Sequence, residues 1–323
     1  MPSKPPEPRS LSVVIQHYNR PWCLEIAVAL LARELAREGL EHQIILADDG
    51  SDPCLRSLFD RLPLTDVVIQ PQHYCDEENA SVYDTLQMAY DRVRFPVVLF
   101  VQEDFWLVPQ GFIDRDKCHL AGLQTAPDFG TAARPLSAAM RLLDEHPEAH
   151  MVELARSFTN KRYHCRPESE CVHDGIRFQA KVHARHPHFY SCDWPHVMRA
   201  GDDRAVPMPT GRTVWEGERV LVACRRDIFG PGDWVYNPER CFFAHVNVFT
   251  WRAVFKHGLA DRALRWEGAE SSADLPFGQA SDVESNARLM QAYRAGQLDS
   301  VMDHFDGLGP LGYLEFLHRM ISP

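Results

Sequence analysis

The chain lacks any long apolar run: no stretch of its 323 residues approaches the roughly 18 to 20 apolar residues that a transmembrane helix needs. Its first ten residues, MPSKPPEPRS, carry prolines and charges where a signal peptide would carry an apolar segment. We therefore expect a cytoplasmic protein with no transmembrane segment. At 45% hydrophobic residues, the chain still has ample material for a packed core, which excludes a disordered protein.

Paired cysteines and excess positive charge are also missing. The nine cysteines include no CxxC pair, and their odd number argues against a disulfide framework, so we expect most of them to be small buried residues. The formal net charge is −11. Broad binding to nucleic acid or to an anionic membrane needs a concentrated positive field, so neither is expected as a partner.

Apolar strands that alternate with helical segments fill the first part of the chain. The predicted strands LSVVIQH (11–17) and HQIILAD (42–48) flank a segment, 22–38, with apolar residues at helical spacing, and Gly39 ends it. A strand at 66–70, a helix at 82–93 and the strand PVVLFVQED (96–104) follow. Strands of this kind predict a mainly parallel, Rossmann-like central sheet flanked by helices.

From residue 131 the predicted elements are mixed. A helix at 133–146 precedes strands at 151–157, 177–182 and 188–192, a loop at 201–212, the helical segment WEGERVLVACRRDIFG and the strand-rich DWVYNPERCFFAHVNVF. The remainder, 251–323, is predicted to be largely helical. No internal repeat is present, so we expect one two-part α/β domain with a helical C-terminal extension.

Polar residues follow three of the predicted strands directly. In ILADDGSDP (45–53) an aliphatic run stops at two adjacent aspartates. In parallel sheets ligands bind beyond the carboxyl ends of the strands, so such residues are expected to line a crevice. For Asp49 the alternative is a structural one, capping of the turn at Gly50 and Ser51. The residues expected at the crevice are His17, Asn19, Asp48, Asp49, Glu103 and Asp104.

Three segments together resemble the inverting family 2 glycosyltransferases of GT-A fold. SVVIQHYNRP, IILADDGSDP and VVLFVQEDFWLVP are similar, in order and spacing, to the family's strand–turn, DDGS and DxD-type acidic motifs. FYSCDWPHVMR (189–199) and the segment from WEGERVLVACRRDIFG to VYNPERCFFAHVN extend the resemblance more faintly, to about residue 250. Beyond that point the resemblance says nothing.

The resemblance implies an enzyme that transfers a sugar, with inversion, from a nucleotide-diphosphate sugar to a hydroxyl acceptor. The acceptor would be a glycan, a glycolipid or a small molecule. The chain would then divide into a flexible tail (1–10), a nucleotide-sugar-binding half (11–130), a mixed α+β acceptor and catalytic half (131–250) and the helical extension (251–323).

The acidic motif departs from the family's pattern. In that pattern two carboxylate residues have one residue between them, and one of them meets the ribose while the other meets a divalent metal. In FVQEDFW one register pairs Glu103 with Phe105, and the other pairs Gln102 with Asp104. We favour Asp104 as a metal ligand with Glu103 beside it. The resemblance places His245 as a second ligand for Mn²⁺ or Mg²⁺, although a histidine satisfied within a strand is the alternative. Because of Phe105, the requirement for a metal stays open.

Two glutamates are candidates for the general base that deprotonates the acceptor. Glu218 is preferred over Glu216 because its distance from Arg225 best matches the family's pattern. Partial desolvation beside Trp215 would raise the pKa of such a carboxylate, although both glutamates could instead be solvated residues of a first helical turn. Aromatic and polar side chains suit a sugar ring, and the residues expected to bind the acceptor are His188, Tyr190, Asp193, Trp194 and Trp215.

Two other functions are weighed against the transferase. A sugar nucleotidyltransferase would carry a glycine-rich phosphate loop where this chain has HYNRP, which counts against it. A non-catalytic GT-A-like protein that binds a nucleotide sugar or a glycan stays open because Phe105 interrupts the acidic motif.

A zinc site is a further possibility. His164, Cys165, Cys171 and His173 form an HC…CxH set. Their spacing matches no common zinc module, and a loop with chance histidines explains the set more simply.

Overall fold

The computed structural model describes residues 9–70, 82–113, 132–160, 164–182, 194–212, 214–230, 233–246, 282–298 and 300–321. The strands are β1 (Ser10–His17), β2 (Glu41–Asp48), β3 (Asp66–Ile69), β4 (Val97–Gln102), β5 (Phe105–Phe112), β6 (Met151–Glu153), β7 (Cys171–His173), β8 (Ile176–Ala180), β9 (His196–Arg199), β10 (Val235–Pro238) and β11 (Cys241–His245). The helices are α1 (Pro21–Glu38), η1 (Pro53–Leu55), α2 (Arg56–Phe59), α3 (Val82–Tyr90), α5 (Pro135–Glu145), η2 (Pro167–Ser169), α6 (Ala200–Ala205), α7 (Val214–Phe229), α10 (Asp282–Arg294) and α11 (Val301–Ile321).

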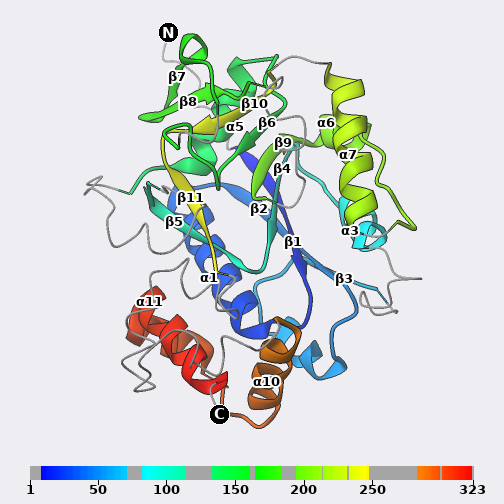
Figure 1. The fold of residues 1–323 in the computed structure, drawn as a ribbon, viewed down its shortest axis with the longest axis vertical. Helices are drawn as coiled ribbons and strands as arrows, with labels where there is room; N and C mark the ends of the chain where they lie inside the picture. The colour runs from blue at the N-terminus through cyan, green and yellow to red at the C-terminus, as the bar shows by residue number, and fades with distance from the viewer. Residues whose placement is uncertain are drawn as a thin grey trace, which may run out of the picture.

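A nine-stranded sheet with the order β3-β2-β1-β4-β9-β6-β10-β8-β7 forms the centre of the described chain (Figure 1). β3, β2, β1 and β4 pair in parallel. β9 is antiparallel to both β4 and β6, so β6 runs in the direction of β4, and β10 pairs in parallel with β6. β8 is antiparallel to both β10 and β7. This mixed α/β architecture with a mostly parallel sheet confirms the predicted class and is consistent with the GT-A fold.

β1 is buried on both faces between β2 and β4. Val13, Val14 and Ile15 are fully buried, as expected for a strand of continuous apolar residues in a parallel sheet. Pro21 stands at the start of α1 and Gly39, with φ 67°, ends it in the left-handed conformation that glycine allows. The prediction for this strand–helix–strand unit is confirmed.

A second sheet, made of β5 and β11, is absent from the sequence prediction. β5 begins at Phe105, directly after the acidic residues, and pairs antiparallel with β11 so that Phe105 lies opposite His245. Two further expectations are wrong: residues 200–205 form helix α6 where a loop was expected, and Cys171–His173 form strand β7. In both cases tertiary contacts order a short polar segment whose sequence has little periodicity.

The last two described helices lie at the end of the molecule opposite β7 and β8 (Figure 1). The Tyr313 hydroxyl of α11 donates to the backbone carbonyl of Trp22 at 3.2 Å, and Arg294 of α10 pairs with Asp52. The helical prediction for the extension is confirmed here, while residues 251–281 lie outside the described chain. None of the described helices combines the length and the apolarity needed to cross a bilayer.

Helix α7 packs against α3 through a glycine. A Cβ atom added at Gly217 would lie 1.8 Å from Cε2 of Tyr83, whose side chain is almost fully buried. Alanine is the better helix former by about 1 kcal/mol, but overpacking costs typically about 1–3 kcal/mol. We therefore expect Gly217→Ala to lower the free energy of unfolding in a urea titration.

The matched control is Gly201→Ala in α6, where an added Cβ meets nothing within 4 Å. This variant should be neutral or slightly stabilising. Equal effects at the two glycines would show that Tyr83 does not fill the space against α7.

Candidate active site

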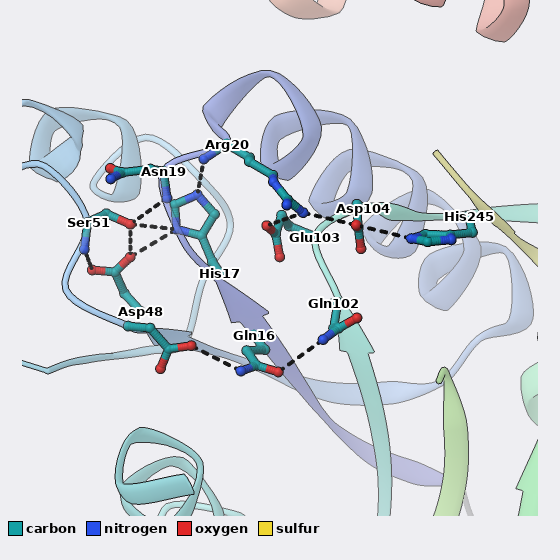
Figure 2. Close-up of polar contacts among 11 residues, drawn as sticks. Gln16, His17, Asn19, Arg20, Asp48, Ser51, Gln102, Glu103, Asp104 and His245 are labelled. Carbon is teal, nitrogen blue, oxygen red and sulfur yellow. Dashed lines mark hydrogen bonds and ion pairs between the residues drawn. The ribbon is translucent and has the colours of Figure 1, made fainter. Parts of the chain in front are cut away.

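A buried hydrogen-bond network joins the ends of β1 and β2. The Arg20 backbone N–H donates to Nε2 of His17 at 3.3 Å, so the ring proton sits on Nδ1 and is donated to Oδ1 of Asp48 at 2.9 Å. The backbone N–H and the hydroxyl of Ser51 also donate to the Asp48 carboxylate. Figure 2 shows these contacts at the ends of the two strands. His17 and Asp48 are fully buried. The Asp48 carboxylate therefore accepts its hydrogen bonds from groups within the protein.

Asn19 fixes the two strand-end loops to each other. Its backbone N–H donates to the Ser51 hydroxyl at 2.9 Å, and its side-chain oxygen accepts from the Asp52 N–H at 2.8 Å. Its φ of 46° lies in the left-handed region, which asparagine tolerates better than most residues. This places Asn19 as a structural link at the rim of the site.

Asp49 is held differently from its neighbour Asp48. Its Oδ2 accepts from the Gln16 amide at 3.0 Å, and Gln16 in turn accepts from Gln102 at 3.3 Å. Its Oδ1 is buried and has no hydrogen-bond partner among the described residues. Burial, only partly opposed by the side-chain interactions with Gln16 and Thr85, raises the pKa of Asp49 to about 7. Asp49 therefore keeps an acceptor position free.

Glu103 and Asp104 lie in the turn between β4 and β5. The Arg20 guanidinium is 2.9 Å from Oδ2 of Asp104 and 3.4 Å from Oε1 of Glu103, and Nε2 of His245 is 3.2 Å from the same Asp104 oxygen (Figure 2). Burial opposes ionisation of Asp104, yet His245 and Arg20 lower its pKa below the ordinary range. Burial raises the pKa of Glu103, with Arg20 opposing. Asp104 is thus the more acidic member of the pair.

Phe105 packs against His245. Its ring is stacked on that of His245, with centroids 4.5 Å apart and an interplanar angle of 12°. The arrangement directs His245 towards Asp104, whose Oδ1 is buried and has no hydrogen-bond partner in the described part of the chain. A carboxylate oxygen and an imidazole nitrogen suit a Mn²⁺-like ion. Oδ1 of Asp104 is therefore placed to hold a metal here, and Nε2 of His245 could join it by leaving its contact with Oδ2, which Arg20 also contacts.

Trp194 brings the second half of the chain to this site. Its ring lies 5.6 Å from that of Phe105 and 6.3 Å from that of His245, and the Arg156 guanidinium lies 4.2 Å above it. Because Arg156 covers one face of this half-buried ring, a sugar ring could meet only its other face or its edge. Three of the other predicted acceptor residues, His188, Tyr190 and Asp193, lie outside the described chain.

The predicted general bases lie at the start of α7. Glu216 is an exposed residue of the first turn, and Glu218 is half-buried. Trp215 belongs to the same turn, although its side chain lies outside the described set. The structure thus favours Glu218 as the more desolvated of the two carboxylates, and its role as the base stays a prediction.

Sequence reasoning missed two arginines of the site. Arg20 stands within the YNRP turn, and Arg156 follows β6 as other polar residues follow β1, β2 and β4. This position shortly after a strand is the sequence signal that could have identified both arginines as residues of the site. Arg156 is buried beside Glu153 at 3.2 Å, and Nζ of Lys181 lies 3.4 Å from the same carboxylate. The charge of Arg156 is therefore compensated within the protein while its flat face covers Trp194.

No protein-family model and no curated protein matches the chain. The chain is similar to the structure of glucosyl-3-phosphoglycerate synthase from Mycobacterium tuberculosis in complex with Mn²⁺, UDP and glucosyl-3-phosphoglycerate, at 16% identity over 73% of this chain and 72% of that one, with a TM-score of 0.43. It is also similar to mannosyl-3-phosphoglycerate synthase from Rubrobacter xylanophilus, at 16% identity over 81% and 76%, with a TM-score of 0.42.

A third similar structure is S. aureus TarS 1–349, at 12% identity over 97% of this chain and 88% of that one, with a TM-score of 0.42. Identities and TM-scores this low leave the function to be argued from the site itself.

The raised pKa of Asp49 predicts a pH-dependent effect of Asp49→Asn. Between about pH 4 and pH 7 the unfolded chain releases this proton while the native state keeps it, so the wild type loses stability as the pH rises. The loss is up to about 1.4 kcal/mol per pH unit. Because asparagine does not titrate, the free energy of unfolding of the variant, measured with urea, should rise relative to that of the wild type between pH 5 and pH 8.

Asp48→Asn is the matched control, because the Asp48 carboxylate accepts from His17 and Ser51. It should destabilise the protein at both pH values. If the free energy of unfolding of Asp49→Asn instead falls further below that of the wild type from pH 5 to pH 8, the result would contradict a raised pKa at Asp49.

Proposed function

We propose that the protein is a glycosyltransferase that moves a sugar from a nucleotide-diphosphate sugar to a hydroxyl acceptor, with inversion and with a divalent cation. One observation carries the proposal. Asp49 follows β2 and Asp104 follows β4, on either side of β1, and each keeps a buried carboxylate oxygen with no hydrogen-bond partner among the described residues. Buried polar atoms are nearly always hydrogen-bonded, so two such oxygens at one sheet edge indicate ligand positions.

Asp49 is proposed to recognise the nucleoside. A carboxylate accepts hydrogen bonds and so matches the imino and hydroxyl donors of a base and a ribose. His17, Asn19 and Asp48 would then act by holding the loop after β2 in place, because their hydrogen bonds run to one another and to Ser51. The proposed nucleotide site thus consists of a carboxylate oxygen of Asp49, available to accept a hydrogen bond, on a loop held in place by hydrogen bonds.

Asp104 and His245 are proposed to hold the divalent cation. A bound Mn²⁺ or Mg²⁺ would stabilise the negative charge of the leaving diphosphate. Arg20, 2.9 Å from Asp104, presents a second positive charge with a planar guanidinium that suits phosphate oxygens. Glu103 shares that guanidinium and would balance it when no diphosphate is bound.

The acceptor is proposed to lie against Trp194 and to lose its proton to Glu218. His188, Tyr190, Asp193 and Trp215 remain the other candidates for this side of the site. Attack from the face opposite the diphosphate would invert the anomeric centre. A cytoplasmic location, and a glycan, glycolipid or small molecule as acceptor, belong to the same proposal.

Nucleotide binding tests the donor site. A thermal-shift screen against UDP, GDP, dTDP and CMP, with and without Mn²⁺ or Mg²⁺, should show one nucleotide that raises the melting temperature in a metal-dependent way. At a ligand concentration of 100 Kd the stabilisation is about 2.7 kcal/mol. Asp104→Asn should remove the metal-dependent part of the shift.

Asp306→Asn serves as the matched control, because Asp306 is a solvent-exposed carboxylate in α11 that pairs with Arg33. It should bind as the wild type does. A screen with no shift for any nucleotide would reject the donor site. A nucleotide shift without any donor hydrolysis or transfer would favour the non-catalytic binding protein instead.

The general base is tested by paired substitutions on α7. Glu218→Gln should lower kcat by about 10²–10⁴-fold with little change in donor binding, because a positioned base contributes that range. Glu216→Gln, at the exposed neighbouring position, should keep near wild-type kcat. Equal kcat values for the two variants would remove Glu218 from the mechanism.

A further inference from the structure

Three side chains that can ligate a metal converge at the edge of the sheet formed by β7, far in strand order from β1 and β4. His146 directly follows α5, and Cys171 and His173 are alternate residues of β7, so they point to the same face of that strand. Sγ of Cys171 and one ring nitrogen from each histidine all lie within 4.8 Å of one another.

Neighbouring carboxylates orient both histidine rings. Nδ1 of His146 is 3.1 Å from Oε1 of Glu148, which also accepts from the Tyr236 hydroxyl at 3.3 Å. Nδ1 of His173 faces Oε2 of Glu145 at 3.6 Å. A carboxylate against one ring nitrogen is the usual support of a metal-binding histidine, because it leaves the other nitrogen with its lone pair free.

The second nitrogen of His173 is the clearest sign of a binding site. His173 is 6% exposed, and its Nε2 is buried with no hydrogen-bond partner in the described part of the chain. A buried polar atom in this state is rare in native structures and calls for an explanation such as an ion.

We propose that His146, Cys171 and His173 bind a divalent cation of the zinc class through the two Nε2 atoms and Sγ. Zinc bonds of about 2.0–2.1 Å to nitrogen and 2.3 Å to sulfur place ligand atoms roughly 3–4 Å apart. Small side-chain rotations therefore close the present cluster around an ion. Three protein ligands leave one position of a tetrahedral ion for water.

The site is chemically distinct from the proposed Asp104–His245 pair. A thiolate and two imidazoles select zinc-like ions and disfavour Mg²⁺, whereas a carboxylate and an imidazole accept harder ions. It also differs from the HC…CxH set of the sequence, because Cys165 lies before η2 and its backbone forms an isolated antiparallel β-bridge with Lys181. A bound ion would tie the edge strand β7 to the end of α5, at a junction where Arg141 already pairs with Asp174 at 3.3 Å.

Cobalt substitution of the full-length protein tests the proposal. Co²⁺ at a site with a cysteine ligand gives a thiolate-to-metal charge-transfer absorption in the near ultraviolet, which an Asp104–His245 site cannot give. We expect this band to saturate at one equivalent, to be displaced by Zn²⁺ and to be lost in Cys171→Ser. It should persist in Asp104→Asn, which separates this inference from the proposed transferase function.

Two further variants complete the test. Glu148→Gln, at a side chain 60% exposed, should fold normally and weaken Zn²⁺ binding by about 10–100-fold, because it removes the carboxylate that orients the His146 ring. Cys54→Ser removes an exposed thiol elsewhere and should leave both the band and the affinity unchanged. No band in the wild type, or Zn²⁺ affinity unchanged in both Cys171→Ser and Glu148→Gln, would overturn the site.

Discussion

The parallel pairing of β1 with β2 on one side and β4 on the other is the constraint on which the site depends. In this register His17 lies beside Asp48, and Gln16 lies beside both Ala47 and Gln102. Because the three strands run in one direction, their carboxyl ends share an edge, and residues from positions 17, 49 and 104 come together. Arg20, three residues beyond β1, then reaches the acidic turn after β4.

In each of two pairs of adjacent carboxyl groups, the surroundings make the two members differ in hydrogen bonding or in pKa. In the first, Asp48 receives hydrogen bonds from His17 and Ser51 while Asp49 keeps a free oxygen. In the second, His245 and Arg20 favour the charged form of Asp104, and burial favours the neutral form of Glu103. The site therefore holds four acidic groups close together, and burial raises the pKa of one member of each pair, Asp49 and Glu103.

The sequence predicts the parts of this arrangement that depend on local pattern. Apolar runs locate β1, β2 and β4, and the polar residues at their ends locate the crevice, because strand direction follows from the alternation with helices. It does not predict that Asp49 and not Asp48 is available, since the two are neighbours and the difference is set by His17 and Ser51, which donate to the Asp48 carboxylate. The pairing of β5 with β11 and the meeting of His146 with Cys171 and His173 depend on contacts between distant segments, which no short pattern encodes.

The C-terminal helices carry a consequence for how the chain acquires its structure. Trp22 and Trp106 from the first half share a single apolar core with Phe305 and Tyr313 of α11, and the Tyr313 hydroxyl binds a carbonyl 291 residues earlier in the chain. Domains usually fold from the N-terminus while synthesis continues, but contacts of such long range must wait for their partner. The nascent protein therefore keeps the Trp106 ring without its contacts to Phe305 and Tyr313 until α11 leaves the ribosome, and exposed apolar surface in this interval favours aggregation.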